Sequence, residues 1–512
     1  MNYIELFAGC GGLSLGLEAS GYNLVIANEL SPMASETFAY NFFNEKLEGN
    51  TSPKNTLWIN SSFPKDEIQK RLRENPKTYP AIQEGGHSDI DSEVVLDKKL
   101  LIGSIVELNK LLEQSPELLQ QIKDSNLPDG LDLVSGGPPC QSFSMAGLRQ
   151  LSNERNSLPW EFAKFVDLTR PKFVILRAFS TEKGQFYAWY EVSKAFVKIG
   201  YVPLCLHVNA KYAGVAQNRP RFILLGIRID VYEKIISKLN IKEKEALTHS
   251  FEFFKKVQVC PDLEYGHLNY FDVDKNTDFF EQSFLKPLVK FKGREFTVQD
   301  AIQDLSTTST QTKSMYVNTL DSLFNPLLTA HDSLSNNVLR TNGIHVRKRF
   351  KLYQNLNLVS QATKKEVQQI LKGNIDFISD TAFDELRPLS FLNEDDQIIH
   401  FDKCDEFLEY LKVHQTKKQT QKALIPNKPA PAALSIPDDA CHYIDLRTLT
   451  VREMARIQSF PDNFKFLSKV TTGGQMRKFE VPQYTQVGNA VPPLLGFALG
   501  QSLKYLIDIY KS

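Results

Sequence analysis

The stretch ELFAGCGGLSLGLEASGY, residues 5–22, decides the fold. It places a Gly-rich turn between a first strand and a first helix, where bare backbone can approach a ligand at the helix N-terminus. The next apolar run, residues 23–30, ends in Glu29. A carboxylate at the carboxyl end of a second strand can accept hydrogen bonds from ribose hydroxyls. Together these features predict a site for an adenosine-containing cofactor.

Further apolar runs continue the pattern to about residue 230. Runs rich in Val, Ile, Leu and Phe, each followed by turn residues, are typical of buried strands in a mainly parallel sheet covered by helices. We therefore expect an α/β open sheet. The runs are YIELFAG (3–9), NLVIANEL (23–30), LDLVSGG (131–137), FVILRAF (173–179) and RFILLGIR (221–228).

Two regions lack this pattern of apolar runs followed by turn residues. Residues 44–99 are rich in Gly, Pro, Ser and charge, and predict a surface insertion with a short helix near 65–74. Residues 230–440 mix polar helical and aromatic stretches, which indicates a second, irregular domain. From residue 447 onward the pattern predicts a helix, a loop and a long amphipathic helix.

Composition narrows the class of protein. The 512 residues allow two to four domains, and 42% hydrophobic with 23% charged residues is typical of a globular protein. Sixty basic and sixty acidic residues exclude a uniformly basic protein of the kind that wraps nucleic acid. A nucleic acid would therefore bind to a local basic patch. Six scattered cysteines indicate neither a disulfide framework nor a zinc site, and nothing predicts a membrane span. We expect a cytoplasmic protein without a metal.

The motif GGPPCQSFS, residues 136–144, follows the apolar run LDLV. Two prolines stiffen the backbone ahead of Cys140 and present its thiol at a strand end, as a nucleophile requires. A buried structural cysteine is the alternative interpretation.

Five motifs occur in the order known from DNA cytosine-5 methyltransferases, and the chain resembles this family over residues 1–230 and about 430–512. The resemblance implies a Rossmann-like domain dependent on S-adenosylmethionine, with a smaller, irregular target recognition domain. It implies boundaries at 1–229, 230–446 and 447–512, the last segment returning to the catalytic domain. The motifs are ELFAGCGG (5–12), GGPPCQSFS (136–144), VAQNRPRF (215–222), LTVREMARIQSFPDNF (449–464) and QVGNAVPP (486–493).

The resemblance also implies a mechanism. In this family a cytosine is flipped out of the duplex, a Pro-Cys thiolate attacks ring carbon 6, and carbon 5 takes the methyl group. Cys140 would be the nucleophile. Gln217, Arg219 and Arg221 fall on the Gln-x-Arg-x-Arg pattern of one strand, where Arg221 would bind the cytosine carbonyl oxygen and Arg219 would brace the pocket.

Further residues carry over by their motif positions. The charges around Arg452, Glu453 and Arg456 are explained by a helical salt-bridge set, so we assign them to structure. The residues expected to bind the cofactor are Phe7, Gly9, Gly11, Gly12, Leu13, Glu29, Ser104, Ile105, Pro138, Asn489 and Val491. Those expected to contact DNA are Gln141, Ser144, Arg347, Lys348 and Arg349.

Two positions break the family pattern. The family's Glu-Asn-Val triplet, whose Glu protonates the cytosine ring nitrogen, is replaced by Arg177, Ala178 and Phe179. Arginine cannot act as a general acid near neutral pH, and losing a positioned acid costs about 10²–10⁴ in rate. Ser104 stands where the family commonly has an Asp that contacts the adenine amine, which predicts altered cofactor binding.

Three hypotheses for Arg177 stay open. Another carboxylate, such as Glu182, takes over the role of the missing Glu; or the protein is an inactive DNA-binding homologue; or it carries out an altered reaction, either on another base or with a modified, anionic donor. A dehydrogenase would share the Gly-rich turn but would not need the later motifs, and the large middle region favours DNA over RNA. The expected partners are double-stranded DNA and a restriction endonuclease encoded nearby, with the protein itself a monomer.

Overall fold

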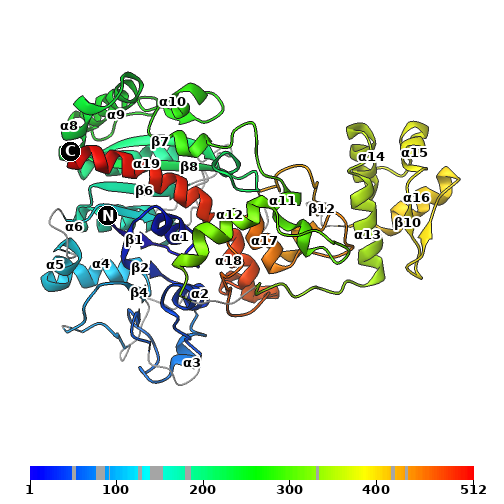
Figure 1. Cartoon of the computed structure of the whole chain (residues 1–512), viewed down its shortest axis with the longest axis horizontal. Helices are drawn as coiled ribbons and strands as arrows, with labels where there is room; N and C mark the ends of the chain where they lie inside the picture. Colours follow the sequence, from blue (N-terminus) through cyan, green and yellow to red (C-terminus); the bar gives the residue numbers. More distant parts are fainter. Residues whose placement is uncertain are drawn as a thin grey trace.

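The computed structural model describes residues 1–48, 53–75, 87–91, 93–124, 130–138, 154–178, 186–329, 334–416, 421–432 and 436–512. A nine-stranded sheet lies at its centre (Figure 1). Strands β6, β8 and β7 pair antiparallel and the other neighbours pair parallel, which confirms the mainly parallel α/β prediction. In spatial order the strands are β3 (Thr56–Trp58), β4 (Lys99–Ile102), β2 (Asn23–Glu29), β1 (Asn2–Leu6), β5 (Leu133–Gly136), β6 (Phe173–Ala178), β8 (Pro220–Arg228), β7 (Tyr201–Asn209) and β9 (Tyr270–Asp272).

Two hydrophobic cores cover the two faces of this sheet. The first core is formed with α1 (Gly12–Ala19), α2 (Pro32–Phe43), α8 (Ile229–Ile235), α10 (Thr277–Glu281), α11 (Val298–Ile302), α12 (Met315–Phe324), α17 (Val451–Ile457), α18 (Gln483–Asn489) and α19 (Pro493–Lys511). The second is formed with α4 (Ile105–Gln114), α5 (Pro116–Asp124), α6 (Glu154–Thr169), α7 (Phe186–Lys198) and the end of α9 (Ile241–Val259).

A third core lies at one end of the molecule and is separate from the sheet (Figure 1). It contains the buried side chains of Phe350, Leu411 and Cys441. We call residues 344–441 the helical unit. Its elements are α13 (Ile344–Asn355), α14 (Gln361–Leu371), α15 (Asp380–Leu386), β10 (Phe391–Leu392), β11 (Ile398–Ile399), α16 (Cys404–Val413), β12 (Lys422–Ala423) and β13 (Ala440–Cys441).

The cores divide the middle of the chain differently from the expected boundary at residue 230. Strand β9 pairs with β7 and extends the main sheet, and Phe280 and Leu320 belong to the first core. These residues therefore pack with the sheet, because their apolar faces cover α19 and α17 instead of forming a core of their own.

The predicted insertion also contributes to the sheet. Strand β3 forms its edge, and Trp58 is fully buried. The short helix expected near 65–74 is α3 (Ile68–Arg71), where Arg71 forms a buried ion pair of 2.6 Å with Asp89. A surface insertion is thus the wrong description of residues 56–58, although it holds a short helix as predicted.

The C-terminal helix α19 packs against α1, as the sequence predicts (Figure 1). Glycines line both sides of this crossing. A Cβ atom built at Gly16 would lie 2.4 Å from the backbone nitrogen of Phe497, and one at Gly500 would lie 2.5 Å from Ser20 Oγ. Ser20 Oγ in turn donates a hydrogen bond of 3.0 Å to the Phe497 carbonyl. The two helix backbones therefore approach too closely for larger side chains. Among the described helices, none has the length and apolar content to cross a membrane.

We predict that Gly16→Ala destabilises the protein, although alanine is the better helix former by about 1 kcal/mol. The added methyl group would press on the backbone of α19, and overpacking of this kind costs roughly 1–3 kcal/mol. Urea unfolding measures the change. Gly473→Ala is the matched control, because no atom lies within 4 Å of its Cβ position. Equal stability of the two variants would contradict the close crossing.

Candidate active site

The Gly-rich loop between β1 and α1 lies at the carboxyl edge of the sheet and binds the end of β2. Gly9 and Gly11 have φ angles of 58° and 94°, which favour glycine. The Gly9 backbone N–H donates to Glu29 Oε2 at 2.8 Å, and the Ser31 N–H donates to Glu29 Oε1 at 2.7 Å. Burial raises the pKa of Glu29, and these N–H donors oppose that shift.

The Glu29 carboxylate has room for a further ligand. A carboxylate offers about four acceptor sites, and two are used by the backbone donors. Leu30 follows at the same edge and is 37% exposed, which is unusual for leucine beside a strand end. An acceptor for a diol and an apolar surface for a flat ring thus lie side by side. Sequence reasoning identified Glu29 but missed Leu30, whose position after the strand was the available signal.

The C-terminal segment closes over this loop. A Cβ at Gly12 would lie 2.2 Å from the Val491 carbonyl oxygen, and Cys10 Sγ lies 3.8 Å from the Gln486 carbonyl oxygen. Asn489 is exposed at the end of α18. The expected loop over 486–489 is therefore the last turn of a helix. The C-terminal segment and the Gly-rich loop therefore pack against each other.

The other expected cofactor residues differ in exposure. Phe7 is partly exposed at the loop, whereas Leu13 is 2% exposed and belongs to the first core. Ser104 caps α4, because its side chain accepts a hydrogen bond from the Val106 N–H at 3.2 Å. Ile105 packs in the second core, and Pro138 is buried where β5 ends.

Two arginines hold three consecutive carbonyl oxygens of the C-terminal segment. Arg219 Nη2 donates to the carbonyls of Gly488 at 2.6 Å and Ala490 at 3.2 Å. Arg177 Nη1 donates to the carbonyl of Asn489 at 3.2 Å. We call this arrangement the arginine clamp. It ties the ends of β6 and β8 to the segment that closes the Gly-rich loop.

Arg219 and Arg221 do not share a strand face as expected. Strand β8 begins at Pro220, so Arg219 precedes it and turns inward, where it is 3% exposed. Gln217 is also buried and donates to the Pro431 carbonyl at 3.1 Å, whereas Arg221 is partly exposed. Arg219 therefore lies before the strand and Arg221 within it.

The site is electropositive. Burial lowers the pKa of Arg219, and the neighbouring charges of Arg221 and Arg177 lower it further. Arg177 also lies over the turn that follows β5, since a Cβ at Gly137 would be 2.9 Å from Arg177 Nε. Cationic surroundings of this kind stabilise a thiolate. Cys140, Gln141, Ser144, Phe179 and Glu182 lie outside the described residues.

Glu5 is a buried carboxyl on β1 that sequence reasoning did not select. It is 3% exposed and accepts a hydrogen bond from Ser14 Oγ on α1. Burial raises the pKa of Glu5 to about 8, against the opposing effects of Ser14 and the Arg177 charge. Sequence reasoning did not select Glu5 because it lies inside an apolar run, and a charged residue of a strand is usually exposed.

The basic cluster expected to contact DNA lies on α13 and is largely neutralised. Arg347 pairs with Asp396, and Lys348 pairs with Glu394. Lys348 is 4% exposed and Arg349 is 8% exposed. These side chains stabilise the helical unit, and little of their charge faces solvent.

The charges of α17 are structural, as expected, but their partners come from other segments. Arg456 binds Asp462 at 2.7 Å and Asp304 at 2.6 Å. Arg452 donates to the Pro461 carbonyl at 2.6 Å, and Glu453 pairs with Arg447 at 2.7 Å. The set is therefore tertiary and not a helical i, i+4 series.

Comparisons with known proteins identify one family and several similar proteins. The model of the family described as C-5 cytosine-specific DNA methylase matches residues 1–68 and 107–505. The type II methyltransferase M.DdeI of Desulfomicrobium norvegicum is 25% identical over 99% of this chain and 89% of its own length. M1.HphI of Haemophilus parahaemolyticus is 23% identical over 98% and 86%. A crystal structure described as a DNA modification methyltransferase of an E. coli prophage aligns over 99% of both chains, with a TM-score of 0.48 and 19% identity.

We predict that Glu5 makes the protein less stable as the pH rises. A carboxyl whose folded pKa is about 8 instead of 4.5 holds a proton longer in the folded state, so stability falls between pH 5 and 8. The slope from one such group is at most about 1.4 kcal/mol per pH unit. Glu5→Gln can keep the Ser14 contact, and urea unfolding across this range should show a flatter profile.

The control is Glu252→Gln, which changes an exposed carboxylate of α9. It should preserve the wild-type pH profile. A steep wild-type slope that survives Glu5→Gln would show that Glu5 does not hold a proton in the folded protein.

Proposed function

The chain belongs to the C-5 cytosine-specific DNA methylase family, and we propose that it methylates carbon 5 of a cytosine within a specific duplex sequence. Members of this family use S-adenosylmethionine, which supplies the methyl group. One observation carries the proposal. The Gly-rich loop, Glu29 and the arginine clamp converge at one edge of the sheet, beside the turn that leads to Cys140. In α/β sheets, ligands bind at this edge.

The residues present fit the cofactor. Glu29 retains acceptor capacity for the ribose hydroxyls, and Leu30 offers an apolar surface to the adenine ring. The loop that contains Gly9 is open, since no atom lies within 4 Å of its Cβ position. Ser104 is engaged in capping α4, so its hydroxyl is a weaker partner for the adenine amine than the family's Asp. Phe7, Asn489 and Val491 would complete the walls.

In the proposed reaction, the Cys140 thiolate adds to carbon 6 of the flipped cytosine. The electron pair released at carbon 5 would bond to the methyl group as the methyl's bond to the donor's sulfonium sulfur breaks, which leaves a neutral thioether; the carbon 5 hydrogen then leaves as a proton to solvent. Its bonding electrons expel the Cys140 sulfur and restore the ring double bond. Arg221 would donate to the cytosine carbonyl oxygen, while Arg219 holds the closing segment in place.

Arg177 has a positioning role in this proposal. Its guanidinium donates to the Asn489 carbonyl and cannot supply a proton to the cytosine ring near neutral pH. The acid must therefore come from another carboxyl group, for which Glu182 is the proposed residue. The site lies at an electropositive edge, which would support ionisation of Cys140.

The remaining assignments are also proposals. We propose that the region expected at 230–446, and within it the helical unit, reads the DNA sequence, with segment 447–512 completing the catalytic domain. A restriction endonuclease encoded nearby and a monomeric state belong to the same proposal. Of the two, only the endonuclease is supported by the names of the type II relatives.

The function is tested by expressing the protein in a host that lacks cytosine methylation. Nucleoside mass spectrometry of plasmid DNA should detect 5-methyldeoxycytidine, and bisulfite sequencing should place it in one recurrent sequence. Plasmid without the gene is the control. Unmodified DNA, both in the host and after incubation with excess purified protein and S-adenosylmethionine, would reject the proposal.

A second candidate function, DNA binding without turnover, is favoured by Arg177 itself. Arg177→Glu distinguishes the two. If another carboxylate is the acid, this variant loses the bond to the Asn489 carbonyl and methylation falls about tenfold, as expected for a charged hydrogen bond of about 1.5 kcal/mol. If the protein is inactive for lack of the acid, the variant instead gains activity. Nucleoside mass spectrometry measures either change.

A further inference from the structure

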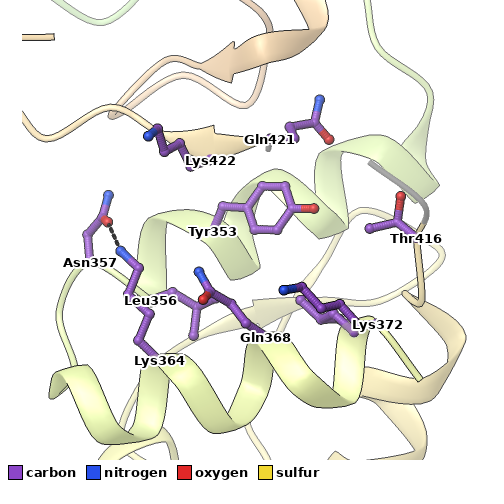
Figure 2. A pocket seen from close by; sticks show the side chains of 10 residues that line it. Tyr353, Leu356, Asn357, Lys364, Gln368, Lys372, Thr416, Gln421 and Lys422 are labelled. Carbon is purple, nitrogen blue, oxygen red and sulfur yellow. Dashed lines mark hydrogen bonds between the residues drawn. The ribbon is translucent and has the colours of Figure 1, made fainter. Parts of the chain in front are cut away.

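A groove in the helical unit gathers lysine side chains around a tyrosine ring (Figure 2). It lies between α13, α14 and the start of β12. We call it the lysine groove after Lys364, Lys372 and Lys422. The other lining residues are Tyr353, Leu356, Asn357, Gln368, Leu371, Thr416 and Gln421.

The charge of this groove is not balanced locally. None of its lining residues is acidic, and Lys364 Nζ donates to the neutral side chain of Asn357 at 2.9 Å. Burial lowers the pKa of Lys364, and the charges of Lys422 and Lys428 lower it further. Gathered ammonium groups without an acid attract an anion.

Five other basic side chains of the helical unit are paired with acids, whereas the ion pairs of the described residues include none with Arg349, Lys351, Lys365 or Lys428. The five pairs are Arg347–Asp396, Lys348–Glu394, Arg387–Asp402, Lys403–Glu406 and Lys412–Glu409. Within the described part of the chain, no ion pair involves the three lysines of the groove. The groove differs from the five pairs because it gathers three lysines and no acidic residue lines it.

Gln421 provides a second, independent sign of a ligand. The residue is 7% exposed, and among the described residues its Oε1 atom has no hydrogen-bond partner. Its amide Nε2 donates to the Asp438 carbonyl at 3.0 Å, which fixes the amide at the groove wall (Figure 2). A buried acceptor without a donor is costly, and because a deprotonated anion has no proton to donate, a water held beside a bound anion would satisfy it.

The groove connects to the candidate active site through adjoining residues. Asp438 also lines a second cavity, together with Arg340, Arg477 and Tyr484. Tyr484 belongs to α18, which ends at Asn489, the residue whose carbonyl binds Arg177. Basic side chains thus occur in the lysine groove, in this cavity beside the Asp438 carboxylate, and in the arginine clamp. A ligand that contacted all three would be long and polyanionic.

The segment after Lys422 makes a second connection. Ala430 accepts a hydrogen bond of 2.7 Å from the Asn218 N–H, and Ala432 accepts one of 3.3 Å from Arg219 Nη1. One continuous stretch therefore joins a wall of the lysine groove to the arginine clamp, which suits a single ligand that contacts both.

We propose that the lysine groove binds backbone phosphates of duplex DNA outside the target base pair and anchors the helical unit on the substrate. The proposal rests on the proposed function, because it takes duplex DNA as the substrate. Phosphate contacts set the register of a protein on DNA and carry no sequence information directly. The groove would thus supply the local patch that a chain with no net charge needs.

The test compares two triple variants by fluorescence anisotropy with a long, labelled duplex at several salt concentrations. Lys364→Gln, Lys372→Gln and Lys422→Gln together should reduce the slope of log affinity against log salt by about 2–3, because each phosphate contact contributes about 0.9. The matched control, Arg387→Gln, Lys403→Gln and Lys412→Gln, removes the same charge from paired positions and should keep the wild-type slope. Replacing the groove lysines by arginine should restore binding.

Equal slopes for the groove variant and the control would overturn the proposal. Loss of ADP or inorganic phosphate binding in the groove variant, with an unchanged DNA slope, would overturn it as well and assign the groove to a free nucleotide or phosphate. The failure of the proposed function is separate. DNA without 5-methyldeoxycytidine would reject methylation, whereas a reduced slope would still establish the anchor.

Discussion

The close crossing of α1 and α19 is the constraint on which the rest of the structure depends. Gly16 and Gly500 bring the first and last helices of the chain into backbone contact. The crossing starts where Gly12 meets the Val491 carbonyl, so the segment before α19 must lie on the Gly-rich loop. A domain built from both ends of the sequence thereby closes into one body, and the residues between them can form a separate helical unit without disturbing it.

The arginine clamp completes this closure on the other side of the segment. Arg177 and Arg219 donate to backbone carbonyls of this segment, which offset their charges only in part. The edge of the sheet is consequently electropositive at the turn before Cys140. Arg177 stands where the family pattern has a glutamate, and it thus has a structural role in this chain. It fastens the closing segment, and in the proposed mechanism proton transfer falls to another group.

The sequence predicts the sheet well where strands are buried on both faces. Strands β1, β2, β5, β6 and β8 coincide with unbroken apolar runs. Strand β7 was missed because Pro203 and His207 interrupt its run, and β9 because three residues carry no pattern. The motif positions of Glu29, Arg177 and Arg219 were predicted, but the inward turn of Arg219 was not, since it depends on where β8 begins.

Pairings across long separations could not be predicted. Lys348 meets Glu394 across 46 residues, and Arg456 meets Asp304 across 152. The basic cluster on α13 therefore looked like a DNA surface, while the lysines of the groove, spread over residues 364–422, did not look like a cluster at all. A sequence shows how closely charged residues are spaced, but it does not show which of them form ion pairs. Whether a basic residue is paired decides whether it can bind an anion.

The central claim, that this edge forms a covalent bond to cytosine through Cys140, is tested most directly by trapping. In duplex DNA with 5-fluorocytosine at every cytosine position, carbon 5 carries fluorine in place of hydrogen. After methyl transfer no proton can leave carbon 5, so the last step of the reaction is blocked. The Cys140 adduct should then persist and appear by mass spectrometry on the peptide that contains residue 140, with S-adenosylmethionine present, and be absent in Cys140→Ser. DNA that is bound by the wild-type protein but never becomes covalently attached would contradict the account.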